Sequence, residues 1–197
     1  MGAVKRVGVL ALQGDFEAHK RALARVGAEA VEVRTAAHLD DVDGLILPGG
    51  ESTTMLKLLE EENLFEPLRH YGRQRPIFGT CAGAILLANE VLNPSQKSLG
   101  LMDMTVERNA YGRQLDSRIV LLESDILQNE CNREFEAVFI RAPIIRRIGR
   151  TVSELTTYDG TPVVVLDGKH LAVTFHPELT QDSRIHHFFV DRLTHTH

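Results

Sequence analysis

The feature of this sequence that most constrains its fold is a short apolar strand followed by a sharp turn and a helix rich in Ala and Leu. It spans Pro76 to Ala88 and reads PIFGTCAGAILLA. Gly79 and Gly83 stand two residues on either side of Cys81, and small residues there allow a tight bend and leave room for a substrate. The pattern predicts a strand–turn–helix corner with the Cys81 side chain pushed outward. The helix is predicted to end near Asn93.

Cys81 is the candidate nucleophile of this corner. A cysteine at a helix N-terminus lies where the helix dipole and the free N–H groups favour the thiolate over the thiol. The alternative is a buried, inert cysteine that begins a core helix, which is the more common fate of an isolated cysteine. The two symmetric glycines favour the nucleophile.

The rest of the first half of the chain alternates apolar strands with helices. Residues 7–12 form a nearly continuous apolar run, as in a strand covered on both faces. A helix is predicted from Phe16 to Val26, with Gly27 as its C-terminal cap. Further strands are predicted at Ala30–Val33 and Val42–Leu47, and a helix at Leu64–Tyr71. This rhythm predicts an α/β fold of three layers, with a largely parallel, flavodoxin-like central sheet flanked by helices.

The second half of the sequence has shorter apolar segments and more frequent turn residues. Short β-like segments alternate with Gly, Asp and Asn turns over residues 101–122 and 137–172. We expect a smaller antiparallel portion here, packed against the parallel core. A helix is predicted around Ser183–Leu193. No linker, repeat or low-complexity segment divides the chain, so residues 1–197 are predicted to form a single domain.

Three polar or glycine-rich segments each follow the carboxyl end of a predicted strand. They contain Gln13, the pair Gly49-Gly50, and Cys81. Parallel sheets bind ligands beyond the carboxyl ends of their strands, so these segments are expected to meet in one crevice. In the segment PGGESTT, residues 48–54, the glycines permit a close approach to a ligand. Ser52, Thr53 or Thr54 is expected to cap the following helix.

The last informative segment is His176-Pro177-Glu178, which follows the apolar run LAVTF. Residues two apart on an extended backbone point to the same side, so Glu178 is expected to reach the imidazole of His176. The alternative is an ordinary surface His and Glu at a strand end. The other histidines of this half are predicted to be solvated and to form no metal site: His170, His186, His187, His195 and His197.

Composition excludes several classes of function. The chain has 197 residues and a formal net charge of -5, without the basic stripe of a nucleic-acid-binding protein. No segment approaches the roughly 20 apolar residues of a membrane span, and the N-terminal apolar run is too short for a signal peptide. The two cysteines, Cys81 and Cys131, do not make a disulfide framework. We therefore expect a cytoplasmic protein without nucleic-acid or membrane partners.

Together these residues indicate nucleophilic acyl transfer. Cys81 would attack a carbonyl, His176 would move protons to the leaving group and from water, and Glu178 would orient the imidazole. The backbone N–H groups of Gly50 and Ala82 are the expected donors of an oxyanion hole. The substrate must be an amide, an ester or a peptide, and the spacing of the residues does not choose among them.

The motifs resemble those of the class I glutamine amidotransferases. The segment GTCAG at residues 79–83 and His176-Pro177-Glu178 are shared with many members. Further segments resemble one branch, the glutaminase subunits of pyridoxal 5′-phosphate synthase. They are LALQGD at 10–15, LPGGESTT at 47–54, VERN at 106–109 with GRQLDS at 112–117, FIRAP at 139–143 and HPELT at 176–180.

The resemblance implies that the chain hydrolyses L-glutamine to L-glutamate and ammonia without a cofactor or a metal. It also implies a hetero-oligomeric complex with a synthase subunit, which uses the ammonia, ribose 5-phosphate and glyceraldehyde 3-phosphate to make pyridoxal 5′-phosphate. The residues carried over by motif are Gly50, Glu51 and Ser52 for the glutamine site, Arg108 for substrate contact, and Ile140 and Arg141 to close the pocket. Gln13 is the candidate contact with the partner.

Two departures from the branch stand out. Arg118 occupies a position where an aromatic residue is expected, and the segment Asn129–Glu136, with Cys131, has no recognisable counterpart. Neither belongs to the expected triad. Both are candidates for altered partner contacts.

Three alternatives remain at this point. An amidotransferase subunit that serves another synthase would share the triad but need not share the Arg108 and Arg141 segments. A free-standing cysteine hydrolase would cleave peptide or ester reporters instead of glutamine. A non-catalytic regulatory module is disfavoured because Cys81, His176 and Glu178 are all present.

Overall fold

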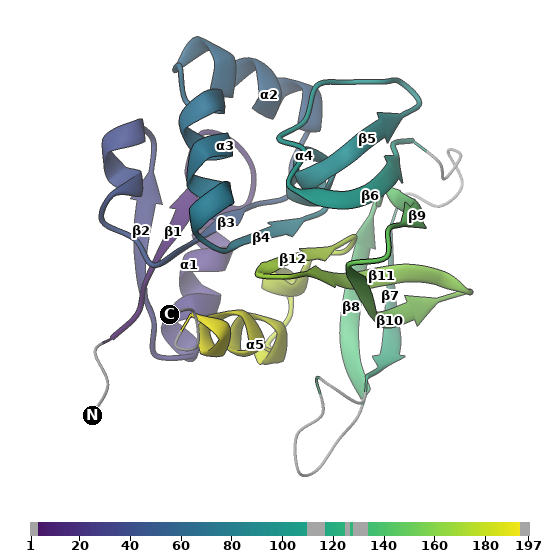
Figure 1. Ribbon diagram of the computed structural model, residues 1–197. Helices are drawn as coiled ribbons and strands as arrows, with labels where there is room; N and C mark the ends of the chain where they lie inside the picture. Colours follow the sequence, from purple (N-terminus) through teal and green to yellow (C-terminus); the bar gives the residue numbers. More distant parts are fainter. Residues whose placement is uncertain (1–3, 110–116, 125–126, 128–133, 194–197) are drawn as a thin grey trace.

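The computed structural model describes residues 4–109, 117–124, 127 and 134–193, and its centre is a seven-stranded sheet (Figure 1). The strand order is β10-β11-β12-β4-β3-β1-β2. Five of these strands run parallel: β1 (Arg6–Leu10), β2 (Glu29–Val33), β3 (Gly44–Leu47), β4 (Ile77–Thr80) and β12 (His170–Val173). The antiparallel strands β10 (Val152–Tyr158) and β11 (Thr161–Asp167) extend one edge. The predicted α/β class is confirmed.

The order of the parallel strands explains where a site can form. From the outer edge inward they follow β2-β1-β3-β4-β12, which is the flavodoxin-like arrangement with its switch point between β1 and β3. The segments after β1, β3, β4 and β12 therefore leave the same end of the sheet. This is the edge at which Gln13, Gly49-Gly50, Cys81 and His176 were expected to meet.

Helices cover both faces of this sheet (Figure 1). One core lies under α2 (Ser52–Glu61), α3 (Phe65–Gln74) and α4 (Ala82–Leu87), and it contains Leu45 and Leu47 of β3. The other lies under α1 (Phe16–Arg25) and α5 (Arg184–Arg192), and it contains Ile46. Successive side chains of a strand point to opposite faces, so a strand buried on both sides reads as an unbroken apolar run. None of the described helices is long and apolar enough to cross a bilayer.

Two smaller sheets flank the central one. The first has the strands β5 (Ala88–Leu92), β6 (Met102–Glu107) and β9 (Ile144–Ile148), in the order β5-β6-β9. The second is an antiparallel ribbon of β7 (Ser117–Glu123) and β8 (Glu134–Ile140). Of the expected antiparallel portion, only β10 and β11 join the central sheet. Short 3-10 turns at Ala36–Leu39 (η1) and Pro177–Leu179 (η2) complete the described elements.

The helix after Cys81 is shorter than the sequence predicts. It ends at Leu87 and not near Asn93, and the next five residues form β5. The carbonyls of Leu86 and Leu87 accept hydrogen bonds from the backbone N–H groups of Leu99 (2.7 Å) and Leu101 (3.0 Å). These carbonyls are thus satisfied by a distant segment of the chain, which local sequence does not reveal.

Candidate active site

Cys81 occupies a strained corner between β4 and α4. Its backbone has φ 48° and ψ −103°, a positive φ that residues other than glycine rarely adopt. Its N–H donates to the carbonyl of Val173 in β12 (2.9 Å), and its own carbonyl accepts from the N–H of Ile85 (3.2 Å). Such a backbone costs about 1–3 kcal/mol and persists only where its surroundings hold it. The predicted strand–turn–helix corner is confirmed.

The two glycines beside Cys81 serve close packing. A β-carbon on Gly83 would lie 2.0 Å from the carbonyl oxygen of Leu47, and one on Gly79 would lie 2.6 Å from the carbonyl of Gly83. Helix α4 can therefore lie directly on β3 and β4 only if both residues lack side chains. The expectation that they make room for a substrate is wrong, because their missing side chains are replaced by backbone.

His176 links Cys81 to Glu178. The Nδ1 atom of its imidazole lies 2.7 Å from Oε1 of Glu178, and both residues are buried. Burial disfavours the imidazolium, but hydrogen bonds to Cys81 and Glu178 outweigh it and raise the pKa of His176 to about 10. Since Glu178 occupies Nδ1, Nε2 is the nitrogen left for Cys81. The expected reach of Glu178 is confirmed, although a 3-10 turn and not an extended backbone brings it there.

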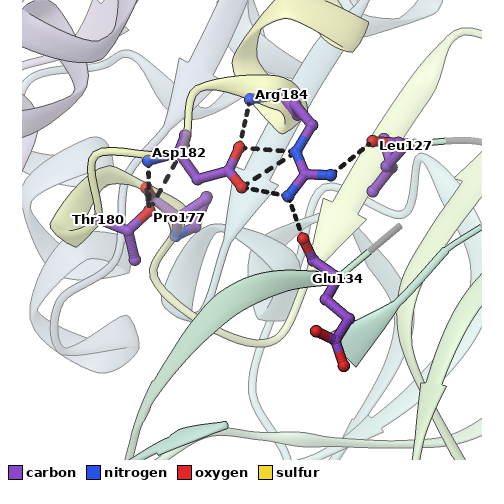
Figure 2. A network of polar contacts seen from close by, with 6 residues as sticks. All are labelled: Leu127, Glu134, Pro177, Thr180, Asp182 and Arg184. Atoms are coloured by element: carbon purple, nitrogen blue, oxygen red, sulfur yellow. Dashed lines mark hydrogen bonds and ion pairs between the residues drawn. The ribbon is translucent and has the colours of Figure 1, made fainter. Parts of the chain in front are cut away.

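A polar network holds the turn that carries Glu178 (Figure 2). The hydroxyl of Thr180 donates to the carbonyl of Pro177 (3.2 Å) and accepts from the N–H of Asp182 (3.2 Å). Arg184 binds both carboxylate oxygens of Asp182 and also donates to the carbonyl of Glu134 at the start of β8. Burial would raise the pKa of Asp182, but its hydrogen bonds to Arg184 lower it. The turn is thereby tied to the β7–β8 ribbon.

The glycine-rich corner after β3 lies against the triad. A β-carbon on Gly49 would lie 2.3 Å from Cε1 of His176, so the imidazole packs directly on this residue. Gly50 has φ 150°, and a β-carbon there would lie 2.6 Å from Oε1 of Gln13. The Gln13 Oε1 atom is buried and accepts no hydrogen bond from the described residues. Ala82 is the first residue of α4, and such N–H groups have no partner within their helix.

A cavity of about 250 Å³ opens over Cys81 and His176. Its volume is near the lower end for ligand sites, which suits a molecule of amino-acid size. All six residues expected to bind substrate line it: Gly50, Glu51, Ser52, Arg108, Ile140 and Arg141. Four lining residues were not singled out from the sequence: Asp15, Ile85, Asn109 and Pro143. All four lie inside segments already quoted, at 10–15, 76–88, 106–109 and 139–143, and that membership is the signal that could have found them.

Glu51 and Arg108 form one wall of this cavity. The Glu51 carboxylate accepts from the N–H groups of Thr53 (3.0 Å) and Thr54 (2.7 Å) and lies 3.5 Å from the Arg108 guanidinium. Burial opposes ionisation, but the hydrogen bonds from Thr54 and Thr53 lower the pKa of Glu51 to about 2. Glu51 is therefore the N-cap of α2, and the expected cap at Ser52, Thr53 or Thr54 is wrong. Ser52 instead donates to Oε1 of Gln96 (3.0 Å).

Arg141 lies on the wall contributed by β8. It follows Ile140 directly and has φ 43°. The backbone N–H of His176 donates to the carbonyl of Val138 in β8 (2.8 Å), which fixes this end of the ribbon beside the triad. In contrast to Arg108, Arg141 has no ion pair or hydrogen bond with the residues that the structure describes. No described residue therefore occupies its guanidinium.

Two of the histidines expected to be solvated are buried. His186 is 0% exposed, and His170 is buried with its Nδ1 accepting from the N–H of Ile77 (3.2 Å). His186 falls on the same helical face as Phe189 and Val190, a spacing that the sequence does contain. His187 is 62% exposed at its side chain, as expected, and His195 and His197 lie outside the described residues.

Among the described residues, the ligand atoms of Asp15, His176 and Glu178 lie within 4.8 Å of one another. His176 and Glu178 already hydrogen-bond each other, so we assign them to proton transfer and not to a metal.

Two departures from the branch were noted in the sequence. Arg118 lies 4.5 Å from the centre of the Tyr158 ring, while Cys131 lies outside the described residues. So do residues 112–116 of the GRQLDS segment.

Comparison with known proteins decides the family of this site. The model of the SNO glutamine amidotransferase family matches residues 9–195. The chain belongs to the SNO glutamine amidotransferase family. It is 56% identical over 192 residues to the pyridoxal 5′-phosphate synthase subunit PdxT of Solibacter usitatus, covering 96% of this chain and 100% of that one. It is 49% identical to the PdxT subunit of Thermotoga maritima, covering 94% and 98%.

A solved structure supports the same family. It is described as the crystal structure of a glutamine amidotransferase, and its TM-score to this chain is 0.87 at 48% identity. The match covers 95% of this chain and 98% of the other. The arrangement of strands and helices around the candidate site is therefore that of a glutamine amidotransferase.

Proposed function

We propose that the chain hydrolyses L-glutamine and supplies the ammonia to the synthase subunit of a pyridoxal 5′-phosphate synthase. The observation that carries this proposal is the relay of Cys81, His176 and Glu178 at the base of a cavity that also holds two arginines. Family membership and the PdxT relatives support the same activity. The alternative of a free-standing peptidase is disfavoured by the small, charged cavity.

The cavity matches the charges of glutamine. The guanidinium groups of Arg108 and Arg141 suit the α-carboxylate, since Arg–carboxylate pairs give strong, oriented hydrogen bonds. Glu51, kept ionised by its hydrogen bonds, supplies a negative group for the α-ammonium. Ile140 covers the substrate from the ribbon side. The side-chain amide can then extend toward Cys81.

The reaction follows from this placement. The Cys81 sulfur attacks the amide carbon, and the N–H groups of Gly50 and Ala82 stabilise the negative oxygen of the tetrahedral intermediate. His176 gives its proton to the leaving nitrogen, so the C–N bond breaks, ammonia departs and a γ-glutamyl thioester remains. His176 next takes a proton from water, which attacks the thioester and releases glutamate. Glu178 keeps Nδ1 of His176 protonated throughout.

Activation by the partner has a candidate device in the Gly49-Gly50 corner. A peptide between two glycines can rotate with little steric cost, so it can present either a carbonyl or an N–H to the oxyanion position. The Gln13 side chain lies against Gly50, and its buried Oε1 has no donor among the described residues. We propose that the synthase subunit contacts Gln13 and thereby sets this corner in its active orientation.

The test is glutamate release from glutamine by the purified chain, with and without a synthase subunit. We expect little hydrolysis by the chain alone and a large rise in kcat on mixing. Gln13→Ala should lose that rise, while Lys57→Ala, at an exposed side chain of α2 outside the cavity, serves as the control. Cleavage of peptide reporters but not glutamine would refute the proposed activity. Full-rate hydrolysis by the lone chain would refute the switch.

A further inference from the structure

A cluster of buried, polar side chains lies behind Glu178, on the side away from the substrate cavity. It consists of His19 from α1, Thr80 from β4 and His186 from α5, and each is 0% exposed. Nε2 of His19 lies 3.2 Å from Oγ1 of Thr80 and 3.5 Å from Oε2 of Glu178. Nδ1 of His19 lies 2.9 Å from Nε2 of His186. The two histidines thus continue the line that begins at Cys81.

The second oxygen of Glu178 depends on this cluster. Oε1 is held by His176, whereas Oε2 is buried and has no hydrogen-bond partner in the part of the chain that the structure describes. A buried carboxylate oxygen without a nearby donor is strongly disfavoured. The terminal torsion of a glutamate is broad, so one hydrogen bond alone leaves the carboxylate free to turn. The Nε2 atom of His19 faces this oxygen at 3.5 Å.

Both histidines of the cluster are neutral at pH 7. Burial, followed by the charges on His186 and His176, lowers the pKa of His19 well below its usual value of 6.5. Burial and the charge on Arg25 lower the pKa of His186 to about 3. A neutral imidazole has one N–H and one bare nitrogen, so the contact between the two rings allows two arrangements.

Only one arrangement suits Glu178. If His186 donates from Nε2 to Nδ1 of His19, then His19 carries its proton on Nε2 and presents an N–H to Thr80 and Glu178. The nitrogen of His186 that has no partner, Nδ1, is then a bare acceptor. In the reverse arrangement a lone pair of His19 faces the Glu178 carboxylate, and a buried N–H of His186 is left unpaired. Unpaired buried donors and facing lone pairs are both unfavourable.

We propose that His19 is a positioning residue for the triad. Its Nε2–H faces Oε2 of Glu178 at 3.5 Å, the electrostatic attraction keeps Oε1 aligned with Nδ1 of His176, and His186 fixes the tautomer in which this N–H exists. The role deepens the proposed function, because it concerns the same relay. It predicts a specific protonation pattern in the resting protein that does not depend on any activity.

The first experiment measures this pattern by ¹⁵N-edited NMR of the histidine rings in the purified full chain. We expect His19 and His186 both to be neutral with the proton on Nε2. His19→Phe keeps a ring against Phe78 but removes the donor, and should shift the Nδ1–H proton resonance of His176. His19→Gln restores an N–H near the former Nε2 and should return that resonance toward its original position. His187→Gln, next to His186 but exposed, is the control.

The second experiment is glutaminase kinetics in complex with the synthase subunit. We expect His19→Phe to lower kcat roughly 10- to 100-fold, the size typical of residues that orient a reacting group through another. The KM for glutamine should change less than about twofold, because His19 does not line the cavity. His19→Gln should recover most of kcat.

Several results would overturn the proposal. The first is an NMR result that places the His19 proton on Nδ1. The second is a His19→Phe variant in which both the His176 resonance and kcat are unchanged. The third is a His19→Gln variant whose kcat is as low as that of His19→Phe. Should His19→Phe fail to fold, the tautomer of the wild-type protein and the behaviour of His19→Gln still decide. If wild type releases no glutamate but the NMR pattern is as expected, the proposed function fails and the positioning role stands.

Discussion

Acid should unfold this protein in a pH range set by its buried neutral histidines. His19, His170 and His186 all have a pKa lowered from 6.5, mainly by burial, to about 4 for His170 and about 3 for His186. A group whose pKa is lower in the folded state binds its proton first in the unfolded chain. Its contribution to stability is complete above pH 6.5 and is lost as the pH falls toward the folded pKa.

The magnitude follows from those shifts. Below pH 6.5, His170 and His186 each lower the free energy of unfolding by about 1.4 kcal/mol per pH unit, which amounts to about 2 kcal/mol each at pH 5.0. His170 and His186 together lose up to about 4 kcal/mol, a large fraction of the whole stability of many domains, about 5–15 kcal/mol, and His19 contributes in the same direction. His19 and His186 share a contact, so their two contributions need not add fully.

Other groups act outside this window. The raised pKa of His176, about 10, makes its contribution complete below pH 6.5 and lost as the pH rises through 10. The lowered pKa values of Glu51 and Asp182 give contributions that are lost only as the pH falls below their usual values of 4.5 and 3.8. A change in the free energy of unfolding between pH 6.5 and 5.0 therefore comes mainly from the buried histidines.

The assay is urea unfolding followed by far-ultraviolet circular dichroism, because the chain has no tryptophan. The free energy of unfolding should fall steeply from pH 6.5 to 5.0. In His186→Gln that fall should be smaller by about 2 kcal/mol, whereas His187→Gln, an exposed neighbour, should leave it unchanged. A flat profile over this range, or an identical fall in His186→Gln and wild type, would refute the reasoning.

Three further predictions concern the site. Cys81→Ala should abolish glutamate release with the fold intact, and Cys81→Gly should be more stable than Cys81→Ala by about 1 kcal/mol in urea unfolding, because glycine relieves the positive φ; equal stabilities would argue against strain. Glu178→Gln should lower kcat less than His176→Ala does, since Glu178 orients the base without transferring the proton; near-normal kcat in both would remove them from the mechanism. Arg141→Ala should raise the KM for glutamine by an amount worth about 1.5–3 kcal/mol, and an unchanged KM with weaker partner binding would place Arg141 at the interface.

The sequence predicted those parts of the structure that local pattern controls. The unbroken apolar run of β1 indicated a strand buried on both faces, and strands were also expected at β3 and β4; the segments after these strands do meet at one edge. The pair His176 and Glu178 was predicted from spacing alone. That residues 1–197 form a single domain stays a prediction.

The parts that were missed depend on contacts between distant segments. Helix α4 ends early because the backbone N–H groups of residues 99 and 101 donate hydrogen bonds to the carbonyls of Leu86 and Leu87. His19 and His186 were not recognised as buried partners because they lie 167 residues apart, and a polar residue among apolar ones reads as solvated until its partner is known. Glu51 was assigned to substrate but not to the cap, since both roles fit the same residue at the same position.

The cavity is assembled from three separate sheets. The triad leaves the central sheet, Arg108 follows β6 of the first small sheet, and Arg141 follows β8 of the ribbon. A glutamine held by both guanidinium groups therefore acts as a crosslink between pieces of the molecule that are far apart in sequence. We expect bound substrate to restrict the motion of the three sheets relative to one another, and product release to remove that restriction. Each turnover would then lower and restore the relative mobility of the three sheets. A partner docked on this edge would respond to that change without contacting the substrate.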